Sequence, residues 1–230
     1  MTQRSCAECA VRDQALCGAL DDCALSAFAT HGRRRRLARG ETLVWAGDEA
    51  VPCATLLSGV VKLCATTADG RDQIVGLLYP ADFIGRPFAG AAEFSATALN
   101  QAELCVFPRG AFERVLEANP AMERRLLART FAALDEARGR MLMLARMSAA
   151  EKVASLLLDV AARAGAAGAE RFELPFTRGE MAEVLGLTIE TVSRQLGRLK
   201  ARGAIALHGA RGIAIRDRAM LVGTDRAARA

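Results

Sequence analysis

Several features that mark membrane, secreted or catalytic proteins are missing from this 230-residue sequence. No apolar run approaches the ~18 residues of a membrane-spanning helix, and the N-terminus lacks the apolar core of a secretory signal. The only two histidines, His31 and His208, stand isolated, and we find no recognisable catalytic nucleophile, paired base or phosphate-binding loop. We therefore expect a cytoplasmic protein without membrane contact that is not an enzyme.

Cysteine, by contrast, is plentiful and unevenly placed. Four of the seven cysteines lie within residues 6–23. In a cytoplasmic chain such residues are more often thiols or metal ligands than a disulfide framework, and the odd total would leave one cysteine unpaired. The N-terminal cysteines are therefore candidate ligands.

The spacing of these cysteines is compatible with a shared metal or cluster. Cys6 and Cys9 are separated by two residues, which allows both sulfurs to bind one metal ion or one cluster edge, and Cys17 follows. Three thiolates from one segment do not complete a four-ligand site. The fourth ligand would be Cys23 or a cysteine in the body of the protein, such as Cys105. By spacing alone, zinc, a dithiol switch and an iron–sulfur cluster remain alternatives.

The net charge of +5 is concentrated near the C-terminus. Residues from Arg171 onward contain 11 Lys and Arg against 6 Asp and Glu, which accounts for the whole excess. A basic segment of this kind favours a polyanionic partner, although a solvated basic surface would have the same composition.

Residues 34–108 have the pattern of short strands separated by turns. Apolar runs of strand length alternate with glycine and proline turn signals, which is typical of a β-sandwich or β-roll. The segment TTADGRDQIVG predicts a hairpin, because Asp-Gly favours the turns that match strand twist. Cys53 and Cys64 lie in strand-like runs, and we expect them to be small buried hydrophobic residues.

Helical patterns follow this region. Residues 109–118 predict a short helix, and Pro120 suits the first turn of the next one. Residues 121–147 carry apolar side chains every three or four positions, which predicts a helix of about seven turns with an apolar stripe. Because such a helix is longer than a small sandwich, we expect part of the stripe to serve self-association.

Two capping boxes mark the helices that come next. Ser148 and Glu151 form the first box, which predicts a helix through about Arg163. Residues 164–170 are rich in glycine and alanine and are expected to be a flexible connector. Thr177 and Glu180 form the second box and open another helix.

The last helical pair has the pattern of a helix-turn-helix. Gly186 ends the helix that Thr177 opens, and Thr188 caps a second helix that runs to about Arg202. Two short helices around such a glycine turn are typical of DNA-binding proteins. The following segment AIALHGARGIAI predicts two strands around a turn, which is the wing of a winged helix.

The first turns of the second helix carry side chains suited to base recognition. Arg194 can donate two hydrogen bonds to guanine, Glu190 can accept one from cytosine, and Ser193 can do either. Basic residues that we expect at phosphates, where they position without specifying sequence, are Arg178, Arg198, Lys200 and Arg202. A solvated charge is the alternative for each of them.

The segment LGLTIETVSRQLGRLKARGAI resembles the recognition helix of the Crp/Fnr family of bacterial transcription regulators, and similarity extends over nearly the whole chain. The resemblance implies an α+β fold with an N-terminal cyclic-nucleotide-binding-like β-roll, a long dimerisation helix and a C-terminal winged helix-turn-helix. The corresponding regions are a cysteine-rich segment (1–30), the roll (31–118), the dimerisation helix (119–147) and the DNA-binding domain (148–230).

The Glu190, Ser193 and Arg194 pattern resembles the fumarate-and-nitrate-reduction (FNR) branch of this family. That resemblance implies an oxygen-responsive homodimer that binds double-stranded DNA at TTGAT-like palindromes and acts on RNA polymerase. It also implies a [4Fe–4S] cluster on three N-terminal cysteines and one central cysteine, which here are Cys6, Cys9, Cys17 and Cys105. The longer spacing before Cys17 departs from that of the best-known member, so Cys23 remains an alternative third ligand.

A cyclic nucleotide is not favoured as effector. Members that bind one hold its phosphate with a Gly-Glu pair and an Arg-Ser or Arg-Thr pair. Here Arg86 replaces the glutamate after Gly85, and Phe94 replaces the arginine before Ser95. Two alternatives to the cluster-bearing regulator remain: a regulator with another effector in its roll and a zinc or thiol site, and an iron–sulfur electron carrier with an incidental DNA-binding-like tail.

Overall fold

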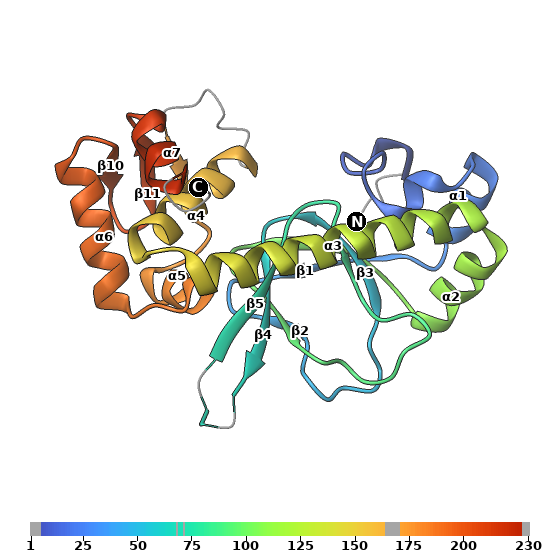
Figure 1. The fold of residues 1–230 in the computed structure, drawn as a ribbon. Coiled ribbons are helices and arrows are strands. Elements are labelled where there is room, and N and C mark those ends of the chain that lie inside the picture. Colours follow the sequence, from blue (N-terminus) through green and yellow to red (C-terminus); the bar gives the residue numbers. More distant parts are fainter. Residues whose placement is uncertain (1–5, 68, 71, 164–170, 227–230) are drawn as a thin grey trace. The chain divides into compact units, whose positions relative to one another are not determined.

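The computed structural model describes residues 6–67, 69–70, 72–163 and 171–226 (Figure 1). The predicted connector at 164–170 lies outside the described residues. The chain divides into two compact units, the first formed by residues 1–71 and 75–135 and the second by residues 72–74 and 136–230. Within the described ranges, no helix is both long and apolar enough to span a membrane.

The cysteine-rich segment at the N-terminus is folded rather than extended. It contains two short 3₁₀ helices, η1 (Cys6–Glu8) and η2 (Leu16–Ala19), followed by helix α1 (Asp22–Ala29). The Asp21 carboxylate accepts a hydrogen bond from the Ala24 N–H at 2.8 Å and caps α1. Leu16, Leu20 and Phe28 are buried, so the segment contributes to the core of the first unit.

Two four-stranded antiparallel sheets form the roll that follows, as the turn pattern predicted (Figure 1). Their facing side chains, among them Leu37, Leu56 and Leu104, are fully buried and form the main hydrophobic cluster. In strand order, the first sheet contains β1 (Arg33–Leu37), β8 (Ala102–Phe107), β3 (Cys53–Ser58) and β6 (Phe83–Ile84). The second sheet contains β2 (Thr42–Val44), β7 (Ser95–Ala98), β4 (Val61–Thr66) and β5 (Asp72–Leu78).

The predicted hairpin and the two strand cysteines are confirmed. Strands β4 and β5 are neighbours, and Gly70 in their turn has a positive φ of 79°, a conformation that glycine adopts without steric cost. Cys53 is fully buried and Cys64 is 7% exposed. Both therefore behave as small core residues.

Helices α2 (Arg109–Ala118) and α3 (Pro120–Arg146) match the predicted boundaries. Among the described residues of α3, only the Met122 side chain is buried. Leu126 is half-buried against the same cluster, and most of the other apolar side chains of the stripe are exposed. Leu127, Phe131 and Leu142 are 55%, 58% and 67% exposed. The prediction that part of the stripe would be left exposed is thus confirmed.

The second unit has the order of a winged helix-turn-helix. Its elements are α4 (Ala149–Arg163), β9 (Phe172–Glu173), α5 (Arg178–Leu185), α6 (Ile189–Ala201), β10 (Ile205–His208), β11 (Gly212–Ile215) and α7 (Arg218–Arg226). Strands β10 and β11 pair as the predicted wing, and β9 pairs with β11.

Both predicted capping boxes are present. The Ser148 N–H donates to the Glu151 carboxylate at 2.6 Å, and the Glu151 N–H donates to the Ser148 hydroxyl at 3.4 Å. In the second box, the Thr177 N–H donates to the Glu180 carboxylate at 2.6 Å, and the Glu180 N–H donates to the Thr177 hydroxyl at 3.2 Å. Gly186 ends α5 in the left-handed region, with φ of 59°.

Candidate functional site

The structure places the four predicted ligand cysteines in one neighbourhood of the first unit. Cys6 lies in η1, Cys9 just after it, Cys17 in η2 and Cys105 in strand β8. All four are half-buried. Segments almost a hundred residues apart in the chain therefore supply one group of thiols.

Packing shows that these thiols are near one another: Cys6, Cys17 and Cys105 contact one hydrophobic cluster, and Cys9 and Cys17 contact another. As thiolates they also raise one another's pKa. Burial is the largest cause that raises the pKa of Cys17 to about 11, and the negative charges of Cys9 and Cys6 raise this pKa further. Burial likewise raises the pKa of Cys105 to about 12, with additional contributions from the other three thiols of the group. Removing a thiol proton here is costly unless a cation or metal compensates the charge.

Cys23 does not belong to this group. It is exposed on α1 and is not among the charges that act on Cys6, Cys17 or Cys105. The neighbouring Asp21 caps α1, and the Cys23 side chain is exposed to solvent. Of the two alternatives for a third N-terminal ligand, the geometry favours Cys17.

Arginines that the sequence analysis did not single out surround the thiols. Arg34 lies opposite Cys105 in the β1–β8 ladder, and its positive charge offsets part of the rise in the pKa of both Cys105 and Cys6. Burial and the charge of Cys9 raise the pKa of Cys6, and the charge of Arg12 offsets a smaller part of this rise than that of Arg34. Arg125 of α3 likewise offsets part of the rise in the pKa of Cys17. These cations favour thiolates, the form in which cysteine binds a metal.

The donor set fits a group that is held by four thiolates. Four cysteines hold a [4Fe–4S] cluster, and the same set suits tetrahedral zinc. In the part of the chain that the structure describes, however, no three or more His, Cys, Asp or Glu side chains stand in metal-binding geometry. The four thiols are thus neighbours that would have to move closer together to ligate one group.

A second candidate site lies on α6 in the second unit. Its inner face is buried, with Val192, Leu196 and Leu199 at 0%, 2% and 5% exposure. Glu190 and Arg194 are exposed and Ser193 is half-buried, so the three side chains predicted to meet base edges lie on the outer side of the first turns. All four predicted phosphate ligands are exposed, namely Arg178, Arg198, Lys200 and Arg202.

Hydrogen bonds connect several of these side chains. The Arg178 guanidinium of α5 donates to the Ser193 hydroxyl at 3.3 Å, and Arg194 donates to the Thr191 hydroxyl at 3.2 Å. Hydrogen bonds from its own backbone N–H and from Thr188 lower the pKa of Glu190, which keeps this carboxylate ionised as an acceptor. The Arg178–Ser193 contact links the two helices, a link that the sequence pattern alone did not show.

The β-roll contains a third feature, a cavity of about 370 Å³ with mostly apolar walls. Arg86, at its edge, pairs with the Glu93 carboxylate at 2.9 Å and donates to the Ala91 carbonyl at 3.1 Å. Phe94, which replaces the arginine expected in nucleotide binders, also lines this cavity. Among the described residues that line the cavity, the one cation, Arg86, thus already has a carboxylate partner.

Comparison with known domain families and proteins agrees with this architecture. A cyclic nucleotide-binding domain model matches residues 34–119, and a Crp-like helix-turn-helix domain model matches residues 151–223. The transcriptional activator protein FnrL of Cereibacter sphaeroides is 41% identical over 94% of this chain and 90% of its own length. The nitrogen fixation regulation protein FixK of Bradyrhizobium diazoefficiens is 40% identical, with 92% and 90% covered.

The solved structures include a similar fold over most of the chain. FixK2 from Bradyrhizobium japonicum has a TM-score of 0.78 and 30% identity, covering 84% of this chain and 97% of that one. The expected α+β architecture of roll, helices and helix-turn-helix is thus confirmed. FnrL is a transcriptional activator and FixK a regulation protein, and together with the helix-turn-helix match they confirm a DNA-binding regulator and not an enzyme.

Proposed function

Because the chain belongs to the Crp/Fnr family of transcription regulators, we propose that it is an oxygen-responsive member that binds DNA as a dimer while a [4Fe–4S] cluster is intact. Its relatives establish a DNA-binding regulator of the FNR/FixK type. Oxygen response and the cluster are the proposed additions. They are supported chiefly by the grouping of Cys6, Cys9, Cys17 and Cys105, with Cys23 outside the group.

In this proposal the four grouped thiolates hold the cluster. When bound, the cluster would supply an oxygen-labile iron–sulfur core. Cys6, Cys9 and Cys17 would orient the N-terminal segment, and Cys105 would anchor that segment to the rigid β8 strand. Because ligation adds free energy to folding, these four bonds would order residues 6–20 against the roll and the start of α3.

The exposed stripe of α3 is the proposed dimer contact. It leaves large apolar side chains in water that a second copy of the helix would cover. Ordering of the N-terminal segment against the first turns of α3 would favour this pairing. A dimer would then present two recognition helices about one turn of DNA apart.

Base recognition is assigned to three side chains of α6. Arg194 would donate to O6 and N7 of guanine, Glu190 would accept from N4 of cytosine, and Ser193 would complete the contact with a TTGAT-like half-site. Arg178 and Arg198 would bind phosphates and set the position of the helix. Contact with RNA polymerase is part of the same proposal.

Anaerobic purification tests the cluster directly. We expect brown wild-type protein with about four iron and four sulfide per chain, and loss of both in Cys17→Ser and Cys105→Ser. Cys23→Ser is the matched control and should retain the cluster, since this thiol is exposed and outside the group. Colourless, iron-free wild type that still binds DNA tightly would contradict the proposal.

The β-roll cavity supports one alternative function, because it could hold an effector. A regulator with an effector in this cavity would bear zinc or redox-active thiols at the cysteine group instead of iron. Metal analysis of the same anaerobic preparations separates the two proposals, because one zinc per chain without sulfide supports only the alternative.

A further inference from the structure

Two arginines of α3 donate hydrogen bonds to the main chain of the cysteine segment. The Arg125 guanidinium donates to the Ala15 carbonyl at 2.8 Å and to the Asp13 carbonyl at 2.7 Å. Arg129 donates to the Gln14 carbonyl between them. Three successive carbonyls of the loop between Cys9 and Cys17 are therefore bound by one helix.

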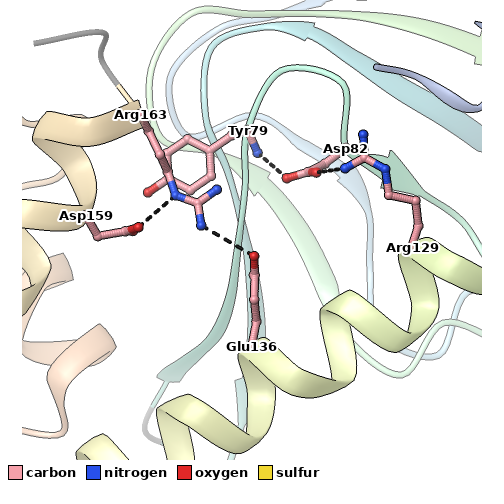
Figure 2. Close-up of polar contacts among 6 residues, drawn as sticks. All are labelled: Tyr79, Asp82, Arg129, Glu136, Asp159 and Arg163. Atoms are coloured by element: carbon pink, nitrogen blue, oxygen red, sulfur yellow. Dashed lines mark hydrogen bonds and ion pairs between the residues drawn. The ribbon is translucent and has the colours of Figure 1, made fainter. Parts of the chain in front are cut away.

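The second arginine is itself anchored to the roll. Arg129 lies 3.5 Å from the Asp82 carboxylate, whose other oxygen accepts the Tyr79 N–H at 2.8 Å (Figure 2). This contact orients the guanidinium toward the Gln14 carbonyl. Because all three loop contacts are to backbone, they depend on the conformation of residues 13–15 rather than on their side chains.

Packing leaves little freedom around the clamp, by which we mean Arg125 and Arg129 with the carbonyls of residues 13–15. A side chain at Gly18, next to Cys17, would lie 2.6 Å from the Arg125 Nη1 atom and 2.2 Å from the Arg12 carbonyl oxygen. Leu16, Leu20 and Met122 pack in one buried cluster beside it. Movement of the loop would therefore displace the helix side chains that touch it.

The clamp and the exposed stripe lie on opposite faces of the same helix. At 100° per residue, Arg125 and Arg129 point about 160–200° away from Leu127. Arg125 and Arg129 are half-buried, whereas Leu127 and Phe131 are more than half exposed. One face of α3 is thus held by the cysteine segment while the other is available to a second chain.

We infer that Arg125 and Arg129 are positioning residues that couple ligation at the cysteine group to the dimer-forming face of α3. The inference rests on the proposed function, since it needs a ligand on the thiols. Linkage makes the coupling reciprocal: if ligation favours the dimer, dimerisation favours retention of the ligand. Without the clamp, the two events become independent.

The test compares dimerisation of the full-length protein with and without its cluster. The proteins are wild type, Arg125→Ala/Arg129→Ala, and the control Arg114→Ala, which removes an exposed arginine from α2 of the same unit. Anaerobic sedimentation gives the dimer Kd, and hydrogen exchange reports protection of residues 9–20 and 120–131. Iron and sulfide analysis establishes the cluster content of each sample.

We expect cluster loading to lower the dimer Kd of wild type and Arg114→Ala by about tenfold or more. In the double variant, the loaded and cluster-free forms should differ by less than about twofold, and loading should no longer protect residues 120–131. If the loaded and cluster-free forms of the double variant differ in dimer Kd as much as those of wild type do, the inference is overturned, whereas the proposed function is not.

Two other outcomes are also decisive. A double variant that cannot be loaded, although its circular dichroism and melting match cluster-free wild type, overturns the coupling role, because the arginines would then serve ligation itself. Wild type that takes up no iron overturns the proposed function, and with it this inference.

Discussion

Single residues decide how the cysteine segment fits against the first unit. A β-carbon at Gly18 would lie within 2.2 Å of the Arg12 carbonyl oxygen and 2.6 Å of the Arg125 guanidinium. The backbone oxygen cannot move away as a flexible side chain would. At this position the absence of a β-carbon is a packing requirement.

We therefore predict that Gly18→Ala lowers the free energy of unfolding by about 1–3 kcal/mol, the usual cost of overpacking. Urea unfolding of the cluster-free protein measures this change. Gly110→Ala in α2 is the control, since its β-carbon would meet only the Arg114 Nη1 atom at 3.7 Å. Equal stability of the two variants would show that the segment is not packed as described.

Substituting a base-contacting arginine and a phosphate-contacting arginine of the DNA-binding unit should change DNA binding in different ways. Arg194→Ala should weaken binding to the matched half-site by about 1–3 kcal/mol and relax specificity at the guanine that Arg194 contacts. Arg198→Ala should weaken binding to all sequences alike. It should also reduce the slope of log K against log salt concentration by about one. Fluorescence anisotropy with matched and mutated half-sites at several salt concentrations separates the two. Loss of specificity in Arg198→Ala instead would reverse the assignments.

At the scale of elements, capping residues determine where several helices begin. The Ser148–Glu151 box opens α4, and hydrogen bonds from Ser148 lower the pKa of Glu151. A carboxyl group whose pKa is lower in the folded than in the unfolded state stabilises the fold at pH values above the unfolded pKa, which is near 4.5. This stabilisation is lost as the pH falls through the pKa of the folded state.

Glu151→Gln should accordingly make the melting temperature less dependent on pH in the acid range. Wild type should lose stability as pH falls below about 4.5, and the variant should lose less over the same interval. Thermal melts followed by circular dichroism measure both curves. The control is Glu173→Gln, an exposed carboxylate in the same unit that lies outside the capping boxes. Identical curves for wild type and Glu151→Gln would contradict the prediction.

At the scale of the whole molecule, the exposed stripe of α3 defines the proposed assembly. Phe131 is 58% exposed and lies near the middle of the helix. Phe131→Ser should raise the dimer Kd of the cluster-loaded protein about 30-fold, which corresponds to ~2 kcal/mol for a buried aromatic contact.

Sedimentation of the loaded protein measures this effect. Trp45→Ser provides the control, because Trp45 is an equally exposed aromatic residue (62%) that lies in the roll rather than on α3. A dimer that tolerates Phe131→Ser would place the interface elsewhere.

Most elements were predictable because their signals are local. The boundaries of α2 and α3 follow from Pro108, Pro120 and the periodic apolar residues, and the two capping boxes locate α4 and α5. The face of α6 followed in the same way, since Val192, Leu196 and Leu199 have helical spacing and are buried. The choice between Cys17 and Cys23 as third ligand was left open by the sequence, because the exposure of Cys23 on a short helix depends on packing between segments.

The sequence by itself determined the order of elements, the recognition helix and the set of cysteines available as ligands, because capping, periodicity and residue chemistry act over a few neighbouring positions. Only the tertiary structure decided which thiols meet: the roll brings β8, and with it Cys105, to the segment that holds Cys6, Cys9 and Cys17. It also decided that Arg125 and Arg129 bind the carbonyls of residues 13–15. Contacts between backbone carbonyls and side chains more than a hundred residues away leave no local pattern in the sequence, since any residue can supply the carbonyl.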